Sequence, residues 1–184
     1  MRKQIGFFAI VAMILVCLTA CEKSPKEMLI GTWHGTKTIT FESGSVRLDG
    51  MDTYKEDGTV SSEATAVYTL DTEIAGVGVQ MKVGLSMKSS GDWTLNDKEL
   101  VLSPSSARVK VTSMKYYDPS DGSFLGHVTG SDLTEASNVF EDELNAALLE
   151  ATTDRIIMQQ EDKFVTESTE DDGTKTTITY HRVK

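Results

Sequence analysis

Cysteine and histidine are scarce in this chain of 184 residues, which contains 2 cysteines and 3 histidines. Both cysteines, Cys17 and Cys21, lie near the N-terminus. If a leader ending at Ala20 is removed, Cys21 is the only cysteine left, so no disulfide can form within the remaining chain. The fold must then depend on a hydrophobic core, which about 160 residues are enough to build.

Basic residues are also few, because 18 Lys and Arg face 28 Asp and Glu, a formal net charge of −10. Proteins that bind nucleic acid present a basic groove to the phosphates, so we expect no nucleic-acid partner. An acidic surface is repelled by anionic lipid headgroups, so we expect it to add little to membrane attachment. The plainest explanation of the excess of carboxylates is solubility.

Motifs of catalysis are missing from the sequence as well. The chain has no nucleophile elbow, no zinc-protease motif and no phosphate-binding loop. The three histidines, His34, His127 and His181, are far apart in the sequence and have no ligand spacing. We therefore expect no enzyme, no cofactor, and no catalytic or metal-ligating residues.

The N-terminus has the three parts of an export signal. Arg2 and Lys3 precede an uncharged run from Ile5 to Leu18, and small residues stand before Cys21. The run is shorter than the roughly 20 apolar residues that a spanning helix needs. We therefore interpret residues 1–20 as a signal peptide, and an ordinary secretory signal with an incidental cysteine stays the alternative.

The sequence Leu18-Thr19-Ala20-Cys21 resembles the lipobox of bacterial lipoproteins. The resemblance implies cleavage before Cys21 and attachment of acyl chains such as palmitate to it, which would hold the protein at a membrane. The expected location is the envelope of a Gram-negative cell, in the first instance the outer membrane, on its periplasmic or its surface face. Residues 21–28 are polar and predict a tether, with one domain over 29–184.

A strict alternation of apolar and small or polar residues predicts a long strand with one buried face. Its apolar members are Val77, Val79, Met81, Val83, Leu85 and Met87. Further on, Val109 and Val111 alternate in the same way, but Met114 and Tyr116 have changed parity. This change predicts a β-bulge near Thr112 or Ser113.

Elsewhere the chain favours β-strands separated by turns, with one exception. Asp49-Gly50 and Asp57-Gly58 are typical turn dipeptides. Residues 132–152 repeat apolar side chains every three or four positions and predict one amphipathic helix, capped by Ser131 or Asp132. We predict an all-β, antiparallel up-and-down barrel of about eight or more strands with this helix inserted before the last three.

Gly31-Thr32-Trp33 opens the first predicted strand, and Gly-x-Trp at this position is similar to the lipocalin signature. With the segments 54–59, 91–100 and 172–174, it resembles the bacterial lipocalin-like lipoproteins over most of the mature chain. The resemblance implies that Trp33 closes the base of the barrel under a basic side chain, for which Arg182 is the match. The helix departs from the family pattern, because lipocalins place theirs after the eighth strand.

The resemblance also implies a small hydrophobic ligand inside the barrel. The residues expected to line its site are the six alternating apolar residues from Val77 to Met87. The same alternation is equally expected of a barrel filled by its own side chains. The alternative is therefore a structural or interaction lipoprotein that contacts an envelope protein, for which exposed apolar residues on the helix, such as Val139 or Leu149, would be a sign.

Overall fold

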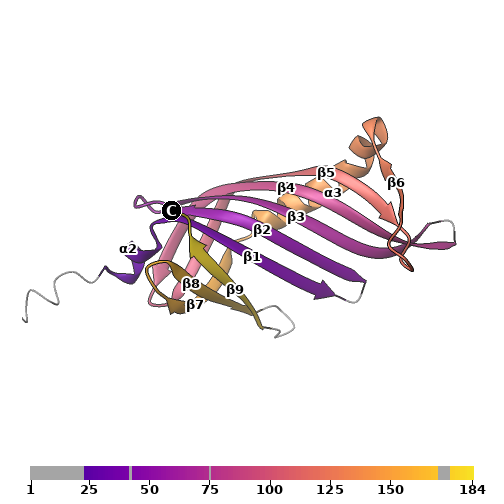
Figure 1. The fold of residues 1–184 in the computed structure, drawn as a ribbon. Coiled ribbons are helices and arrows are strands. Elements are labelled where there is room, and N and C mark those ends of the chain that lie inside the picture. The colour runs from indigo at the N-terminus through magenta and orange to yellow at the C-terminus, as the bar shows by residue number, and fades with distance from the viewer. Residues whose placement is uncertain (1–22, 42, 75, 170–174) are drawn as a thin grey trace, which may run out of the picture.

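A computed structural model describes residues 23–41, 43–74, 76–169 and 175–184. These residues form two helices and nine strands, coloured along the chain in Figure 1. The helices are α2 (Pro25–Leu29) and α3 (Gly130–Leu148). The strands are β1 (Gly31–Phe41), β2 (Gly44–Tyr54), β3 (Thr59–Ile74), β4 (Val77–Asn96), β5 (Glu99–Tyr117), β6 (Phe124–Val128), β7 (Thr152–Gln159), β8 (Lys163–Thr169) and β9 (Lys175–Arg182).

The described strands form one antiparallel sheet in the order β4-β3-β2-β1-β9-β8-β7-β5-β6. Because β4 also pairs with β5, eight of these strands close into a ring and β6 adds to the outside of β5. The predicted all-β barrel with one long inserted helix is confirmed.

Ring closure is confined to one end of the barrel, which we call the base. β1 pairs with β9 only from Trp33 to Thr36, and β5 pairs with β7 only from Glu99 to Leu102. Beyond these short pairings β1 to β5 continue as a long curved sheet, the distal half, along which α3 lies (Figure 1). The base also holds α2, so the described N-terminal residues lie at the closed end.

Helix α3 covers the open edge of β5 in the distal half. The backbone N–H of Val109 donates to Asn145 Oδ1 at 2.7 Å, and that of Val111 donates to Glu141 Oε1 at 2.8 Å. These side chains take the place of a neighbouring strand, which is one way in which proteins protect an exposed sheet edge.

Buried side chains gather in two separate clusters. The base cluster is aromatic and includes Trp33, Tyr54, Trp93 and Phe164. The distal cluster is aliphatic, and α3 contributes three leucines to it. Its members include Val46, Val83, Leu85, Val109, Val111, Leu133, Leu144 and Leu148.

The long strands confirm the predicted bulge and correct one other prediction. The register between β4 and β5 shifts between Gly84 and Leu85, where Thr112 is the extra residue. The turn predicted at Asp49-Gly50 is wrong, because both residues lie inside β2. Gly50 is needed there for close packing, since a Cβ on it would meet the Cβ of Ala64 at 2.8 Å.

The start of the long helix also differs from its prediction. Its N-cap is Thr129 rather than Ser131 or Asp132, and the Thr129 side chain makes no capping hydrogen bond. The helix begins at Gly130, whose φ is 64°, two residues before the predicted start, and the Ser131 hydroxyl donates to Asp132 Oδ1 instead. The segment 172–174, which forms part of the resemblance to the lipocalin-like lipoproteins, lies outside the described residues.

Candidate functional site: the barrel interior and its base

The base of the barrel is closed by Trp33 and Arg182. The two residues are direct partners in the β1–β9 ladder, and the guanidinium carbon of Arg182 lies 4.2 Å from the centre of the Trp33 ring. The indole N–H of Trp33 donates to the carbonyl of Leu29 at 2.6 Å. Gly31 lies close against Arg182, because a Cβ at this position would collide with Arg182 Nη1. The φ of 130° at Gly31 also disfavours any other residue. The structure thus brings together the tryptophan and the arginine selected from the sequence.

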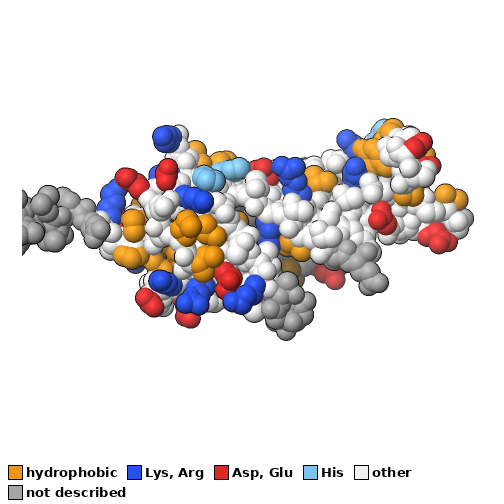
Figure 2. Space-filling view, turned by 60° about the horizontal axis from the view of Figure 1, so that its bottom comes forward, with side chains coloured by type: hydrophobic (Ala, Val, Ile, Leu, Met, Phe, Trp, Pro, Cys, Tyr) orange, Lys and Arg blue, Asp and Glu red, His pale blue; other side chains and the backbone are white. Residues whose placement is uncertain are grey.

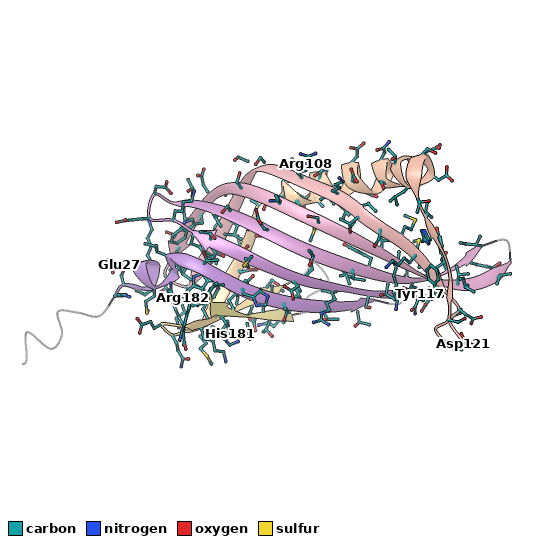
Figure 3. The ribbon with its side chains drawn as sticks, turned by 45° about the horizontal axis from the view of Figure 1, so that its top comes forward. Glu27, Arg108, Tyr117, Asp121, His181 and Arg182 are labelled. Atoms are coloured by element: carbon teal, nitrogen blue, oxygen red, sulfur yellow. The ribbon has the colours of Figure 1, made fainter. Side chains whose placement is uncertain are left out.

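Arg182 also holds the N-terminal segment against the barrel. Its guanidinium donates to the carbonyls of Met28 at 2.5 Å, Ile30 at 2.8 Å and Glu161 at 2.7 Å. A planar fork with several donors suits such a site, where a lysine would offer a single point charge. One side chain therefore joins α2, β1 and the β7–β8 turn (Figure 3).

Helix α2 covers the second half of the segment 21–28 that was interpreted as a tether, and it ends one residue beyond it, at Leu29. Ser24 and Glu27 form a capping box, in which each side chain accepts from the backbone N–H of the other residue. Hydrogen bonds from the backbone N–H and the side chain of Ser24 to the Glu27 carboxyl are the main reason that its pKa is lowered. Leu29, at the end of the helix, is completely buried in the base cluster. The chain is thus bound to the barrel from Ser24 onward, whereas Cys21 lies outside the described residues.

The six residues expected to line a ligand site do not share one environment. Val79, Val83 and Leu85 are buried, and Met81 and Met87 are partly buried. Val77, the first residue of β4, is 61% exposed. Val83 and Leu85 belong to the buried cluster that contains the leucines of α3, and Met81 and Met87 pack against it. The helix therefore fills the space in front of this face.

Between the two clusters lies a polar layer that was not selected from the sequence. A cleft of about 160 Å³ is lined here by Gly35, Gly50, Asp52 and Tyr180, among others. Burial raises the pKa of Asp52; a hydrogen bond from Ser62 opposes this effect and repulsion from Asp154 adds to it. Burial likewise raises the pKa of the Tyr180 hydroxyl. The position of Asp52 in the alternation of β2 was the available signal, because it shares the parity of inward-facing Val46 and Tyr54.

The histidines do not form a site with each other. His34 lies opposite His181 in the β1–β9 ladder, and its Nε2 contacts Asp49 Oδ1 at 2.9 Å. His127 lies in the distal half and stacks on Phe124. Within the described ranges, no three His, Cys, Asp or Glu side chains are arranged to hold a metal ion.

The distal end presents an exposed group of aromatic and apolar side chains on β5 and β6, which we call the distal surface patch. Phe124 and Leu125 are each 55% exposed, and Tyr117 and His127 flank Phe124 at ring distances of 5.7 and 5.9 Å. Figure 3 shows Tyr117 at the end of the molecule opposite Glu27 and Arg182. On α3, Leu149 is 45% exposed, whereas the side chain of Val139 is outside the described part.

The fold and its interior define an antiparallel β-barrel with an aromatic base and a helix over its distal half. Of the helices in the described part of the chain, none has the length and apolar character needed to cross a bilayer. No protein-family model matches the sequence, and no curated protein matches it either.

Proposed function

We propose that the protein is a lipoprotein of the Gram-negative cell envelope, anchored through acyl chains on Cys21, whose barrel is filled by its own side chains and which acts through its surface. The lipobox-like residues Leu18 to Cys21 support the anchor. The packing of α3 against Val83 and Leu85 carries the second half of the proposal, because it places protein where a hydrophobic ligand would lie.

The small size of the remaining interior space also favours a filled barrel. Pockets for small molecules usually measure about 300 to 1,000 Å³ and are mainly apolar. The interior cleft measures about 160 Å³ and contains the side chains of Lys37, Asp52 and Tyr180. A large hydrophobe would fit only if α3 left the sheet.

A surface function is supported by the exposed apolar side chains. The distal surface patch lies far from the base, so an anchored protein would present it away from the attachment point. Contiguous exposed apolar side chains are typical of interaction sites. Phe124 and Leu125 are therefore the residues that we propose to contact an envelope protein.

Native mass spectrometry of the full-length protein, extracted in detergent from its own envelope, tests both halves of the proposal. We expect the mass of a chain beginning at Cys21 with its acyl groups and no stoichiometric companion. A bound apolar molecule would instead support a hydrophobic-ligand carrier. A chain with an unmodified Cys21 would contradict the anchor.

A further inference from the structure

We infer that the base of the barrel lies on the bilayer, with the groove between α2 and β7 facing the lipids. This inference rests on the proposed lipidation of Cys21 and adds to it the face of the domain that meets the membrane. Besides buried Ile156, four apolar residues line the groove, Pro25 and Met28 of α2 and Ile157 and Met158 of β7, and we call these four the base patch.

The first argument is the short reach of the chain between the lipid and the domain. Cys21 precedes Lys23 by two residues, and an extended chain spans at most about 3.6 Å per residue. Lys23 Nζ lies 3.6 Å from a carboxylate oxygen of Glu161. An acyl group on Cys21 is therefore held close to the β7–β8 turn.

The second argument is that α2 cannot swing away as a flexible linker would. Gln159 Nε2 donates to the carbonyl of Pro25 at 2.6 Å, and Arg182 donates to that of Met28. Leu29 is buried completely, so moving the helix would expose it. The anchor thus fixes the base, and not merely the N-terminus, near the membrane.

The third argument is the chemistry of the base patch. Ile157 is 48% exposed and Met158 is 44% exposed, and the groove they share with α2 has a volume of about 330 Å³. Figure 2 shows hydrophobic side chains among Lys, Arg, Asp and Glu side chains at the base end of the molecule. Apolar side chains flanked by lysines suit the boundary between acyl chains and headgroups.

The distribution of charge reduces the repulsion that the acidic composition would cause. Lys23, Lys26 and Lys98 lie near the base patch together with the acidic residues Glu27, Asp97 and Glu161, so the charges there balance. Helix α3, by contrast, carries five acidic residues and no basic residue, and it lies along the distal half. A protein anchored at its base therefore keeps α3 away from anionic headgroups.

The test uses the full-length lipidated protein in phosphatidylethanolamine–phosphatidylglycerol vesicles. The mature chain has no cysteine except Cys21, so Ile157→Cys or Phe124→Cys gives one site for a fluorescent label. We expect brominated lipids to quench the label at position 157 and to leave that at position 124 unchanged. Equal quenching, or none at either position, would overturn the inference.

A second variant separates docking from labelling. A label on Lys98→Cys, beside the groove, reports docking in an Ile157→Ser, Met158→Ser background. Each methylene moved out of water changes an equilibrium constant about fourfold, so we expect the ratio of docked to undocked protein to fall by more than about tenfold. The matched control, Phe124→Ser with Leu125→Ser, should leave quenching unchanged, and circular dichroism checks that each variant folds.

Failure of the anchor is detected separately from failure of docking. A free Cys21 thiol that reacts with maleimide, together with a protein that does not sediment with vesicles, contradicts the proposed lipidation. An acylated protein whose position 157 stays unquenched contradicts docking alone. Protection of position 157 in native envelopes but not in pure lipid vesicles would assign the base patch to a protein partner and overturn the bilayer inference.

Discussion

Two partly buried charged side chains, Arg182 and Asp52, show how differently this barrel treats ionised groups. Arg182 is surrounded by three carbonyl oxygens and the face of Trp33, so its charge is stabilised at every side. Asp52 has Ser62 as its hydrogen-bonding partner, while Asp154 is a second carboxylate nearby. The first arrangement joins segments of the base, and the second penalises ionisation in the middle of the barrel.

Replacing Arg182 should therefore weaken the whole base. Arg182→Ala removes three charge-assisted hydrogen bonds and the contact with Trp33, for which we expect a loss on the order of 3 kcal/mol of unfolding free energy. Urea unfolding followed by tryptophan fluorescence measures this loss. Arg47→Ala, on the exposed outer face of β2, is the control and should change stability by less than about 0.5 kcal/mol. Equal effects of both substitutions would contradict a special role for Arg182.

Asp52 predicts a dependence of stability on pH. Its folded pKa lies above the usual value of 3.8, so the folded state binds the proton more tightly than the unfolded state does. Its contribution to stability is fully present below that value and is lost as pH rises through the raised folded pKa. Asp52→Asn should hence be more stable than the parent at pH 7, and the gain should vanish in acid.

The control for Asp52 has the opposite sign. The carboxylate of Asp57 is exposed and accepts hydrogen bonds from the hydroxyl and the backbone N–H of Thr59, which lower its pKa. Its contribution to stability is therefore present above the unfolded pKa and is lost as pH falls. Asp57→Asn should accordingly lose stability at pH 7. Thermal unfolding across a pH series measures both variants, and a gain for Asp57→Asn with a loss for Asp52→Asn would reverse the argument.

At the residue scale, the sequence predicts what a recurring motif or a simple alternation specifies. Trp33 and Arg182 were selected through the resemblance to lipocalins, in which the tryptophan of the Gly-x-Trp motif lies under a basic side chain from near the end of the sheet. Asp52 was not selected, because pairing between β1, β2 and β3 decides which polar residues meet inside the barrel. Its neighbours Gly35 and Ala64 lie on other strands and far away in the sequence.

At the scale of elements, α3 supports the β5 edge as well as filling the interior. The side chains of Glu141 and Asn145 accept from two backbone N–H groups that no strand reaches. Pro104 lies nearby in β5. Proline has no backbone N–H to donate, so it is tolerated where a strand has an unpaired edge. The helix thus satisfies backbone groups that would otherwise be open to pairing with another chain.

Removing these acceptors should loosen the helix and expose the edge. We expect Glu141→Ala combined with Asn145→Ala to cost about 1 to 3 kcal/mol for each N–H left without an acceptor. Amide hydrogen exchange at Val109 and Val111 measures the effect directly. Glu141→Gln keeps an acceptor and should retain slow exchange, as should Asp142→Ala on the exposed side of the same helix. Unchanged exchange in the double variant would show that packing alone holds α3.

Elements with strong local signals were predictable from the sequence, and those set by long-range packing were not. The alternation from Val77 to Met87 and the parity change after Val111 correctly predicted β4 and its bulged partner. Strand β6 was missed because it is 5 residues long and pairs only with the end of β5. Asp49-Gly50 was misassigned because Gly50 serves contact with Ala64 rather than a turn.

At the scale of the whole molecule, the two buried clusters make the barrel a structure with two halves. The aromatic base is closed by a complete ring of strands and by Arg182, whereas the distal cluster depends on one helix lying along an open sheet. The polar layer of Asp52 and Tyr180 lies between them and contributes little apolar burial. The distal half should therefore open locally at a lower free energy than the base does.

Leucine truncations in the two halves distinguish local opening from global unfolding. Leu144→Ala removes a side chain of α3 from the distal cluster, so we expect a loss of about 2 kcal/mol that speeds amide exchange in α3 and distal β5. Exchange at Trp33 and Phe164 should stay close to the parent, because the base cluster does not contain Leu144. Leu29→Ala acts in the base and should speed exchange in both halves, since unfolding of the closed ring also releases the long strands that it holds. Uniform acceleration by both variants would instead mean that β2, β3 and β4, which run through both halves, couple them into one cooperative unit.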